Sequence, residues 1–578
     1  MDPIKLRKWK LRRKCPEASQ INQLSRKLDI QNLTAQILLF RGITTVEQGS
    51  EFLQAKLSAL PDPALLPDMT IACIRLEQAL VQGEKIAVHG DYDVDGITGC
   101  ALLVETLRAL GGEVEYHIPL RLKDGYGLSA DAIRQAKVNG CSIVLSVDCG
   151  VSAQAEGDLA AELGLDLIIT DHHQPPDKLP ACLALINPHL SANRFPWIEL
   201  AGVGVAFFLL VGLRRRLREN GYFSARSEPD LRRGLDLVAL GTIADIVPLG
   251  GVNRILVRNG LQLLETGVRP GITALKRVAE VKQVSSGTVG FRLAPRLNAA
   301  GRLEDAALGV KLLLSEDLQQ ANPLAELLDG FNRERQKIEQ KTLAEAISLV
   351  EEPNRPQRYS IVLASKNWHS GVIGIVASRL VERYHRPTVL IALEDGQGKG
   401  SARSIGNFNL YQALQENAES LAGFGGHAMA AGLAIKEENL EDFIADFEQV
   451  AADRLRAEEL LPVLSHDGEV TISNFTLPLL RELETLNPFG AGNPQPTFIS
   501  RDCQVYSPRI LADKHLKFAV EQQGSRVDCI AFGQAKKIDQ LDGKVDLLYR
   551  PGINQWRGKE SIQLQVMDMC ASKTKNDD

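Results

Sequence analysis

Residues 85–96 read Lys-Ile-Ala-Val-His-Gly-Asp-Tyr-Asp-Val-Asp-Gly. The apolar run predicts a buried strand, and His89, Asp91, Asp93 and Asp95 lie at its end or directly after it. Carboxylates at such close spacing raise one another's pKa unless a cation neutralises them. Carboxylate oxygens combined with an imidazole suit Mn²⁺ or Mg²⁺ better than they suit a soft metal. Taken alone, however, the stretch is also typical of a solvated acidic turn.

The same arrangement recurs at three later points of the chain, each time with an acidic or histidine side chain directly after an apolar run. Because the carboxyl ends of parallel strands meet at one edge of a sheet, we expect these side chains to converge there. Four such motifs together favour a metal site over a solvated turn. The residues concerned are Asp148 after CSIVLSV, Asp171, His172 and His173 after LDLIIT, and Asp245 after LVALGTIA.

Short β-branched runs alternate with helical stretches over residues 70–270. This alternation predicts an α/β fold with a mostly parallel sheet and helices on both of its faces. The apolar stretch 201–213 predicts a buried helix that is too short to span a bilayer. The predicted parts are an N-terminal segment (1–69), the parallel-sheet domain (70–320), a long connecting helix (321–352), a smaller α/β domain (353–460) and a small β-barrel (461–578).

Composition restricts the class of protein. A chain of 578 residues is too long for one core, so we expect three or four domains. The net charge of −6 means that nucleic-acid binding would depend on a local basic patch. The nine cysteines have no paired spacing and the first residues lack an apolar core, so we expect a cytoplasmic protein without a secretory signal or a membrane partner.

A basic cluster surrounds Trp9 near the start of the chain, within residues 5–14. A charge run of this kind is usually a solvated arm, and that interpretation is favoured here. An arm that touches DNA is the alternative.

The acidic motifs HGDYDVDG, VDCG, DHH and ADIVPL, in this order and spacing, resemble those of the DHH phosphoesterase family. The resemblance implies a site for two divalent metal ions, Mn²⁺ or Mg²⁺. It further implies that Asp91 and Asp171 orient the metal ligands and that His173 donates to the substrate phosphate, so that these three belong to the catalytic set. The implied ligands are His89, Asp93 and Asp148 for one ion, and Asp95, Asp148, His172 and Asp245 for the other.

Further motifs resemble the RecJ family within this group. Residues 398–404 (GKGSARS) and 424–432 (FGGHAMAAG) resemble its DHHA1 domain, while 121–128, 294–303 and 368–374 match its other motifs. The resemblance implies a single-stranded-DNA-specific 5′→3′ exonuclease that releases 5′-mononucleotides in DNA repair and recombination. The implied substrate-binding residues are Arg302, Ser401 and Arg403 at a terminal 5′-phosphate, Arg121 at a nearby phosphate, and Asn298, Gly426 and His427.

The C-terminal β-barrel resembles an OB fold, which binds single strands through backbone charge and base stacking. Trp556 lies in a polar turn and is therefore the best candidate for stacking. The predicted contact residues of this domain are Lys514, His515, Lys517, Phe518, Tyr549, Arg550, Trp556 and Arg557. For any single aromatic residue among them, packing in the core is the favoured role.

Two other functions stay open at this point. A phosphodiesterase acting on dinucleotides or small oligonucleotides would have no need of the C-terminal barrel. A non-catalytic replication scaffold should have lost metal ligands, yet every ligand position of the family is filled. The family also implies protein partners, namely a single-strand-binding protein and a RecQ-type helicase; the working ion and the oligomeric state stay open.

Overall fold

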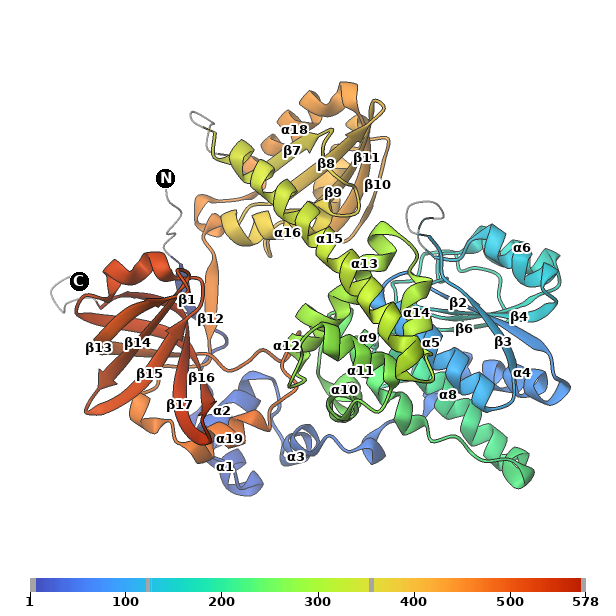
Figure 1. Cartoon of the computed structure of the whole chain (residues 1–578), viewed down its shortest axis with the longest axis horizontal. Coiled ribbons are helices and arrows are strands. Elements are labelled where there is room, and N and C mark those ends of the chain that lie inside the picture. Colours follow the sequence, from blue (N-terminus) through green and yellow to red (C-terminus); the bar gives the residue numbers. More distant parts are fainter. Residues whose placement is uncertain (1–6, 121–124, 126, 353–357, 573–578) are drawn as a thin grey trace. The chain divides into compact units, whose positions relative to one another are not determined.

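The computed structural model describes residues 7–120, 125, 127–352 and 358–572 (Figure 1). The chain forms two compact units. The smaller unit comprises Met1–Lys8, Ala299–Asp305 and Glu326–Leu464, and the larger unit comprises the remaining stretches, Trp9–Asn298, Ala306–Ala325 and Ser465–Asp578. None of the helices described is long and apolar enough to cross a membrane.

The larger unit contains a five-stranded sheet in which all neighbouring strands run parallel. Its strands are β2 (Lys85–Gly90), β3 (Glu113–His117), β4 (Cys141–Val147), β5 (Asp166–Thr170) and β6 (Ala184–Ile186). The strand order is β3-β2-β4-β5-β6. The central strands are apolar at nearly every position because both faces of the sheet are covered.

Helices on both faces confirm the predicted α/β fold. They are α4 (Met69–Gln82), α5 (Val94–Ala109), α6 (Ala130–Val138), α7 (Gln154–Glu162) and α8 (Gly202–Glu219). Helices α6 and α7 pack on one face, and α4, α5 and α8 lie on the other (Figure 1). Helix α8 confirms the buried helix predicted over 201–213.

Further helices complete this part of the chain. They are α9 (Leu235–Ala244), α10 (Gly251–Thr266), α11 (Pro270–Val278), α12 (Ser286–Thr288), a π-helical turn (Val289–Leu293), α13 (Ala294–Leu303) and α14 (Ala307–Leu313). The expectation that Asp245 ends a strand was wrong, because it follows helix α9. An unbroken apolar run of this length fits a buried helix as well as a buried strand, and the sequence does not separate the two.

The smaller unit is built on a mixed sheet of order β10-β11-β9-β8-β7, in which only β7 and β8 are parallel. Its strands are β7 (Ile361–Ser365), β8 (Thr388–Glu394), β9 (Gln397–Arg403), β10 (Gly423–Gly426) and β11 (Ala430–Lys436). Its helices are α16 (Ile373–Tyr384), α17 (Leu410–Glu416) and α18 (Leu440–Arg454). The long connecting helix is present as α15 (Leu318–Val350), which begins before the predicted start and contains Pro323.

A closed five-stranded barrel forms the C-terminal part of the larger unit, as an OB fold requires. Its strands are β13 (Phe498–Leu511), β14 (His515–Gln522), β15 (Ser525–Ala531), β16 (Lys544–Trp556) and β17 (Lys559–Ala571), and α19 (Leu477–Glu484) precedes them. The order is β13-β14-β15-β17-β16, with the parallel pair β15–β17 completing the closure. Several strands are longer than the short runs that the sequence had indicated.

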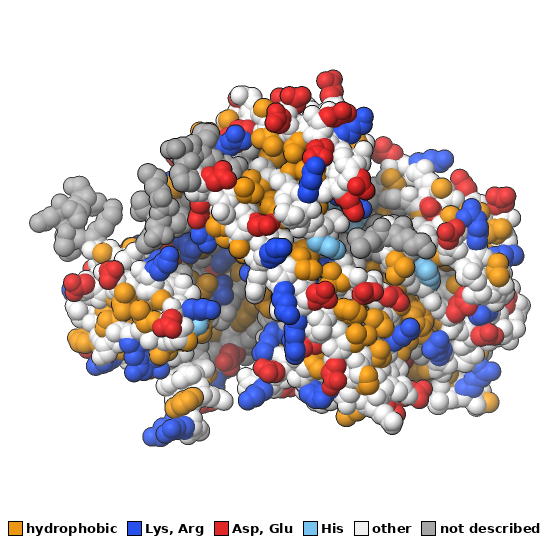
Figure 2. All heavy atoms as spheres, turned by 45° about the horizontal axis from the view of Figure 1, so that its top comes forward, with side chains coloured by type: hydrophobic (Ala, Val, Ile, Leu, Met, Phe, Trp, Pro, Cys, Tyr) orange, Lys and Arg blue, Asp and Glu red, His pale blue; other side chains and the backbone are white. Residues whose placement is uncertain are grey.

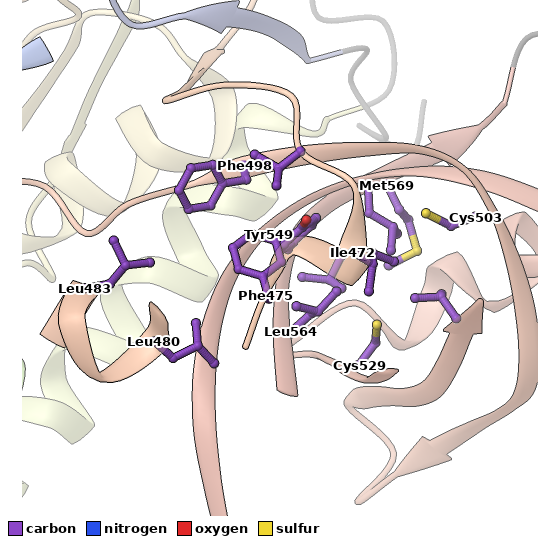
Figure 3. Packing of buried hydrophobic residues seen from close by; sticks show 14 of the residues in the cluster. Ile472, Phe475, Leu480, Leu483, Phe498, Cys503, Cys529, Tyr549, Leu564 and Met569 are labelled. Carbon is purple, nitrogen blue, oxygen red and sulfur yellow. The ribbon is translucent and has the colours of Figure 1, made fainter. Parts of the chain in front are cut away.

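The interior of the barrel holds two aromatic residues that had been predicted to contact DNA. Phe518 is 2% exposed and Tyr549 is 0% exposed, with the Tyr549 hydroxyl 2.7 Å from that of Ser500 (Figure 3). A ring inside the barrel cannot stack on a base, so these two residues have the core-packing role favoured for any single aromatic residue of the domain, and their predicted contact with DNA was wrong. Phe518 shares its strand face with Leu516 and Val520, which are also buried.

The N-terminal segment packs into the same core as the barrel. Its elements are β1 (Lys8–Leu11), α1 (Ala18–Leu28), α2 (Asn32–Phe40) and α3 (Val46–Gln54). Leu24, Ile37 and Leu38 belong to the hydrophobic cluster of the barrel. Strand β1 pairs with β12 (Val463–His466), and Trp9 Nε1 donates to Asp568 at 2.9 Å. The described part of this basic cluster is therefore a paired strand and not a free arm, although Lys8 and Lys10 are exposed to solvent as predicted.

One buried arginine joins three stretches of the larger unit that are distant in sequence. Arg254 of α10 is 1% exposed and donates to the carbonyls of Phe52 (2.7 Å), Leu486 (2.8 Å) and Thr485 (3.0 Å). Its guanidinium also lies 3.6 Å from the centre of the Phe52 ring. A buried charge is tolerated when it is hydrogen-bonded in this way.

Candidate metal centre and phosphate site

Two carboxylates of the first motif meet a third that follows strand β4. Asp91 comes directly after β2, and Asp93 is the N-cap of α5, where its Oδ1 accepts from the Asp95 amide at 2.9 Å and the Gly96 amide at 3.3 Å. Oxygen atoms of Asp91, Asp93 and Asp148 lie within 4.8 Å of one another. Three carboxylates this close form a site suited to a divalent cation.

Asp148 reaches this group through an unusual backbone conformation. Its φ is 63°, and its amide donates to the Thr170 carbonyl at 3.0 Å. A left-handed conformation at a non-glycine residue is strained and is frequent at functional sites. The backbone of Gly202 passes so close that a Cβ there would lie 2.6 Å from the Asp148 Cβ. Only glycine fits at position 202.

A second group forms around His172, which follows strand β5. The His172 Nε2 lies 3.1 Å from Asp148 Oδ1, 3.6 Å from Asp245 Oδ2 and 3.9 Å from Asp95 Oδ2. Ligand atoms of Asp95, His172 and Asp245 lie within 4.8 Å of one another. Asp148 therefore adjoins both groups. The residues that belong to the two groups follow β2, β4, β5 and α9, which places the site at the carboxyl edge of the sheet.

The carboxylate of Asp95 is fixed by the start of helix α8. Its Oδ2 accepts from the Gly202 amide at 2.6 Å, and its Oδ1 accepts from the Val203 amide at 2.9 Å. These amides lie at the positive end of the helix. Gly202 and Val203 were not predicted to take part in the site, although the small residues of AGVG at 201–204 were a signal that could have been used.

The pKa values of the aspartates are shifted because these carboxylates are buried and repel one another, and the pKa of His172 is shifted by burial. Burial and the nearby Asp93 raise the pKa of Asp95 to about 7, while burial and Asp95 raise the pKa of Asp245 to about 9. Burial and Asp95 also raise the pKa of Asp148 well above its usual range. Burial lowers the pKa of His172 to about 4, so its imidazole is neutral at neutral pH.

These side chains fit a divalent cation. The buried atoms His172 Nε2 and Asp245 Oδ2 make no hydrogen bond within the described protein. His172 hydrogen-bonds the backbone of Leu200, and since Nε2 faces the carboxylates, that bond uses the other ring nitrogen. Nε2 then presents a lone pair toward carboxylate oxygens, an arrangement that is repulsive until a cation lies between them.

Asp171 and His173 form a pair beside this centre. Asp171 Oδ1 accepts from the amides of His172 (2.7 Å) and His173 (3.1 Å) and lies 2.7 Å from His173 Nδ1, and its Oδ2 accepts from the Val151 amide at 2.9 Å. Burial lowers the pKa of His173, but the hydrogen bond to Asp171 and the negative charges of Asp171, Asp245 and Asp93 together raise it to about 9. His173 is therefore protonated at neutral pH and can donate to an anion.

His89 does not belong to either of the two groups of ligand atoms described above. Its Nε2 is 3.1 Å from the Gly127 carbonyl, and its ring centre is 5.1 Å from that of His117. Its role as a metal ligand stays a prediction. Asp91, which had been expected to orient other ligands, has an oxygen in the group with Asp93 and Asp148.

The smaller unit brings together the three residues predicted to hold a 5′-phosphate. Ser401 and Arg403 lie two positions apart on β9, and Arg403 Nη1 donates to the Ser401 hydroxyl at 3.2 Å. Gly374, in the first turn of α16, approaches both, since a Cβ there would lie 2.8 Å from Ser401 Oγ. Arg302 Nη1 donates to the Gly371 carbonyl just before this helix at 2.8 Å. Cations around a helix N-terminus suit a phosphate.

The remaining predicted substrate residues lie in several places. His427 is exposed in the turn after Gly426, between β10 and β11, and its amide donates to the Ala430 carbonyl at 2.8 Å. Ala430 pairs with Arg403 across the sheet. Asn298 Oδ1 accepts from the Val94 amide of the larger unit at 3.1 Å. Arg121 lies outside the described residues.

Trp556 is 69% exposed at the end of β16, where the Arg557 guanidinium lies 5.8 Å from its ring centre. The barrel therefore offers an exposed aromatic next to a cation, which is the combination that binds unpaired bases.

Family models match three parts of the chain. The N-terminal domain of the DHH family matches residues 85–242, the DHHA1 domain matches 358–453, and the RecJ OB domain matches 466–568. The "Single-stranded-DNA-specific exonuclease RecJ" of Dickeya dadantii is 42% identical over 91% of this chain and 94% of that protein.

The chain belongs to the RecJ family. The RecJ of Thermus thermophilus, solved in complex with Mn²⁺, matches this fold with a TM-score of 0.84 and 32% identity over 98% of this chain and 80% of that chain. The same protein in complex with Mg²⁺ matches with a TM-score of 0.78 and 31% identity, covering 98% of this chain and 79% of that chain. These RecJ neighbours confirm the predicted fold class.

Proposed function

We propose that this protein is a single-stranded-DNA-specific exonuclease that hydrolyses phosphodiester bonds with two divalent cations, Mn²⁺ or Mg²⁺. One observation carries the proposal: oxygen atoms of Asp91, Asp93 and Asp148 adjoin a second group of Asp95, His172 and Asp245 at one sheet edge, in a chain of the RecJ family. The RecJ neighbours solved with Mn²⁺ and with Mg²⁺ support this choice of cation.

Cations bound there would lower the pKa of a water molecule and stabilise the charge that develops on the phosphate. The protein's own residues would hold and orient that site. The helix α8 amides fix Asp95, and the backbone of Leu200 fixes the ring of His172. The protonated His173, held by Asp171, would donate to a phosphate oxygen of the scissile group.

A 5′→3′ direction and the release of 5′-mononucleotides form a further part of the proposal. Arg302, Ser401 and Arg403 gather at the start of α16. A terminal phosphate carries two negative charges and would accept more hydrogen bonds from these donors than a singly charged internal phosphodiester. A pocket of this kind would favour the 5′ end of a strand. Arg121, Asn298, Gly426 and His427 belong to the same proposed substrate set.

The barrel is proposed to hold the strand through exposed cations and Trp556. The domains are proposed to end at residues 69, 320, 352 and 460. A cytoplasmic location is also proposed, and the nine free cysteines support it. Partnership with a single-strand-binding protein and a RecQ-type helicase follows from the family alone.

A degradation assay tests the proposal against its two alternatives. The protein is incubated with Mn²⁺ and a single strand, a duplex or a dinucleotide, with and without EDTA. We expect rapid, EDTA-sensitive loss of the single strand from its 5′ end and slow attack on the duplex. Preference for the dinucleotide would favour a small-molecule phosphodiesterase, and no hydrolysis of any substrate would favour a non-catalytic scaffold.

A further inference from the structure

An exposed aromatic side chain in the larger unit has no role in the metal or phosphate sites. Phe291 is 86% exposed, more than any other large hydrophobic side chain of the described residues. A single exposed apolar side chain is common and needs no explanation by itself, and Figure 2 shows apolar side chains on the surface. Two features distinguish Phe291 from such residues. It lies in a π-helical turn, and its segment, Ser285–Asn298, has the barrel at one end and the candidate metal centre at the other.

The backbone around Phe291 directs its ring away from the core. The residue lies in the middle of the π-helical turn Val289–Leu293, and both end residues of that turn are 0% exposed. Since these two anchors point into the core, the residue midway between them faces the opposite side. Turns of the π type are rare in proteins, and many of those that occur lie at functional sites.

One end of the segment lies at the metal centre. Asn298 Oδ1 accepts from the Val94 amide at 3.1 Å, and Val94 stands between Asp93 and Asp95. Gly290, next to Phe291, lies against α9, because a Cβ there would be 3.8 Å from Ile243 Cγ2. Ile243 is two residues before Asp245.

The other end of the segment lies at the barrel. Ser285, Ser286 and Gly287 line a cavity of about 330 Å³ together with Pro551 and Gly552 of β16. The segment therefore extends from a strand of the proposed DNA-binding barrel to helix α5, which carries Asp95 and has Asp93 as its N-cap, all within the larger unit.

Two exposed cations lie close to Phe291 in the sequence. Arg292, the next residue, and Lys282 are both exposed. Positive charge beside an exposed ring is the combination that binds single-stranded nucleic acid, in which the charge follows the backbone and the ring stacks on a base.

We propose that Phe291 stacks on an unpaired base of the DNA strand between the barrel and the metal centre. This inference rests on the proposed function and adds a residue that selects the substrate. A base inside a duplex is stacked on its neighbours and paired, so it cannot turn toward the ring without a cost in free energy. Stacking on Phe291 would therefore favour single strands.

The test compares Phe291→Ala and Phe291→Trp with Val138→Ala, which alters an apolar residue that is 79% exposed at the end of α6, outside this segment. The substrates are a 5′-phosphorylated single strand and a strand of equal length with a run of abasic sites. We expect Phe291→Ala to lower kcat/KM on the normal strand about tenfold or more. On the abasic strand, Phe291→Ala and the unaltered protein should be equal, and Phe291→Trp should restore the normal rate.

Three results would overturn the inference: an unchanged kcat/KM for Phe291→Ala, an equal loss on both strands, or no recovery with Phe291→Trp. Melting temperatures show whether each variant is folded, and Val138→Ala should behave like the unaltered protein throughout. If the unaltered protein degrades neither strand, the proposed function itself fails. If the strand is degraded at the same rate with and without the substitution at Phe291, the proposed function is retained and only the stacking role is rejected.

Discussion

At the scale of single residues, Asp148 is the carboxylate that adjoins both groups of candidate metal ligands. We predict that Asp148→Asn, which keeps the shape but removes the charge, lowers kcat about a hundredfold or more, because it weakens both cation sites at once. Single-turnover nuclease assays in Mn²⁺ measure this, and binding of a labelled strand should change little. Asp131→Asn is the matched control, since that side chain is 97% exposed. Activity above about a tenth of the unaltered rate would contradict an essential role for Asp148.

Arg403 tests recognition of the strand end. A hydrogen bond to a charged group is worth about 1.5–3 kcal/mol, so Arg403→Ala should slow degradation of a 5′-phosphorylated strand roughly ten- to hundredfold. A strand with a 5′-hydroxyl should be affected much less. The comparison variant is Arg454→Ala, which removes an ion pair with Glu416 in the same unit. Equal slowing of both strands by Arg403→Ala would mean that the pocket does not read the 5′-phosphate.

Much of the metal centre could be predicted because strand ends in a parallel sheet converge by geometry. Asp148 and His172 follow strands as expected. Asp245 follows a helix instead, and its apolar run has no period that separates helix from strand. The small residues around Gly202 were a usable signal, but Leu200 could not be identified, because it acts through its backbone and a backbone group leaves no chemical signature in a sequence. Phe518 could have been placed correctly, because it alternates in step with Leu516 and Val520.

At the scale of elements, the boundary predicted at residue 460 cuts through a shared core. Leu24, Ile37 and Leu38 of α1 and α2 pack into the barrel cluster. We predict that a protein truncated after residue 460 has helices α1 and α2 exposed to solvent, because their apolar partners are gone. Limited proteolysis should then cut within residues 18–40, which resist in the full chain. Equal resistance in both proteins would mean that the N-terminal helices fold independently.

The sequence did not reveal this packing, because the partners are too far apart along the chain. Amphipathic spacing shows that α1 has an apolar face, but it does not show which element covers that face. The same limit applies to Trp9, whose partner Asp568 is separated from it by 559 positions. Local patterns predicted the parallel sheet, the long helix and the barrel, and contacts between the distant ends required the structure.

At the scale of the whole molecule, cation binding should stabilise the fold. Asp91, Asp93, Asp95, Asp148 and Asp245 crowd together, and their repulsion is relieved by a divalent ion. A ligand at a hundred times its Kd stabilises by about 2.7 kcal/mol, so Mn²⁺ should raise the Tm by a few degrees, roughly 2–4 °C, relative to the protein in EDTA. Differential scanning calorimetry measures the shift.

Two controls accompany the measurement of the Tm. Na⁺ at matched ionic strength should give no comparable increase, and Asp148→Asn should lose most of the Mn²⁺ effect while Asp131→Asn keeps it. A Tm that does not respond to Mn²⁺ in the unaltered protein would argue against cations at these carboxylates.

The three carbonyls held by Arg254 have a consequence for the newly synthesised chain. The Phe52 carbonyl is available early, whereas those of Thr485 and Leu486 emerge more than four hundred residues later. At about 5–20 residues per second, translation leaves an interval on the order of tens of seconds. During that time the early helices lack the late segment that buries them, and a nascent polypeptide in this state is exposed to proteases and to aggregation. Chaperones that bind apolar helices would be needed most during this interval.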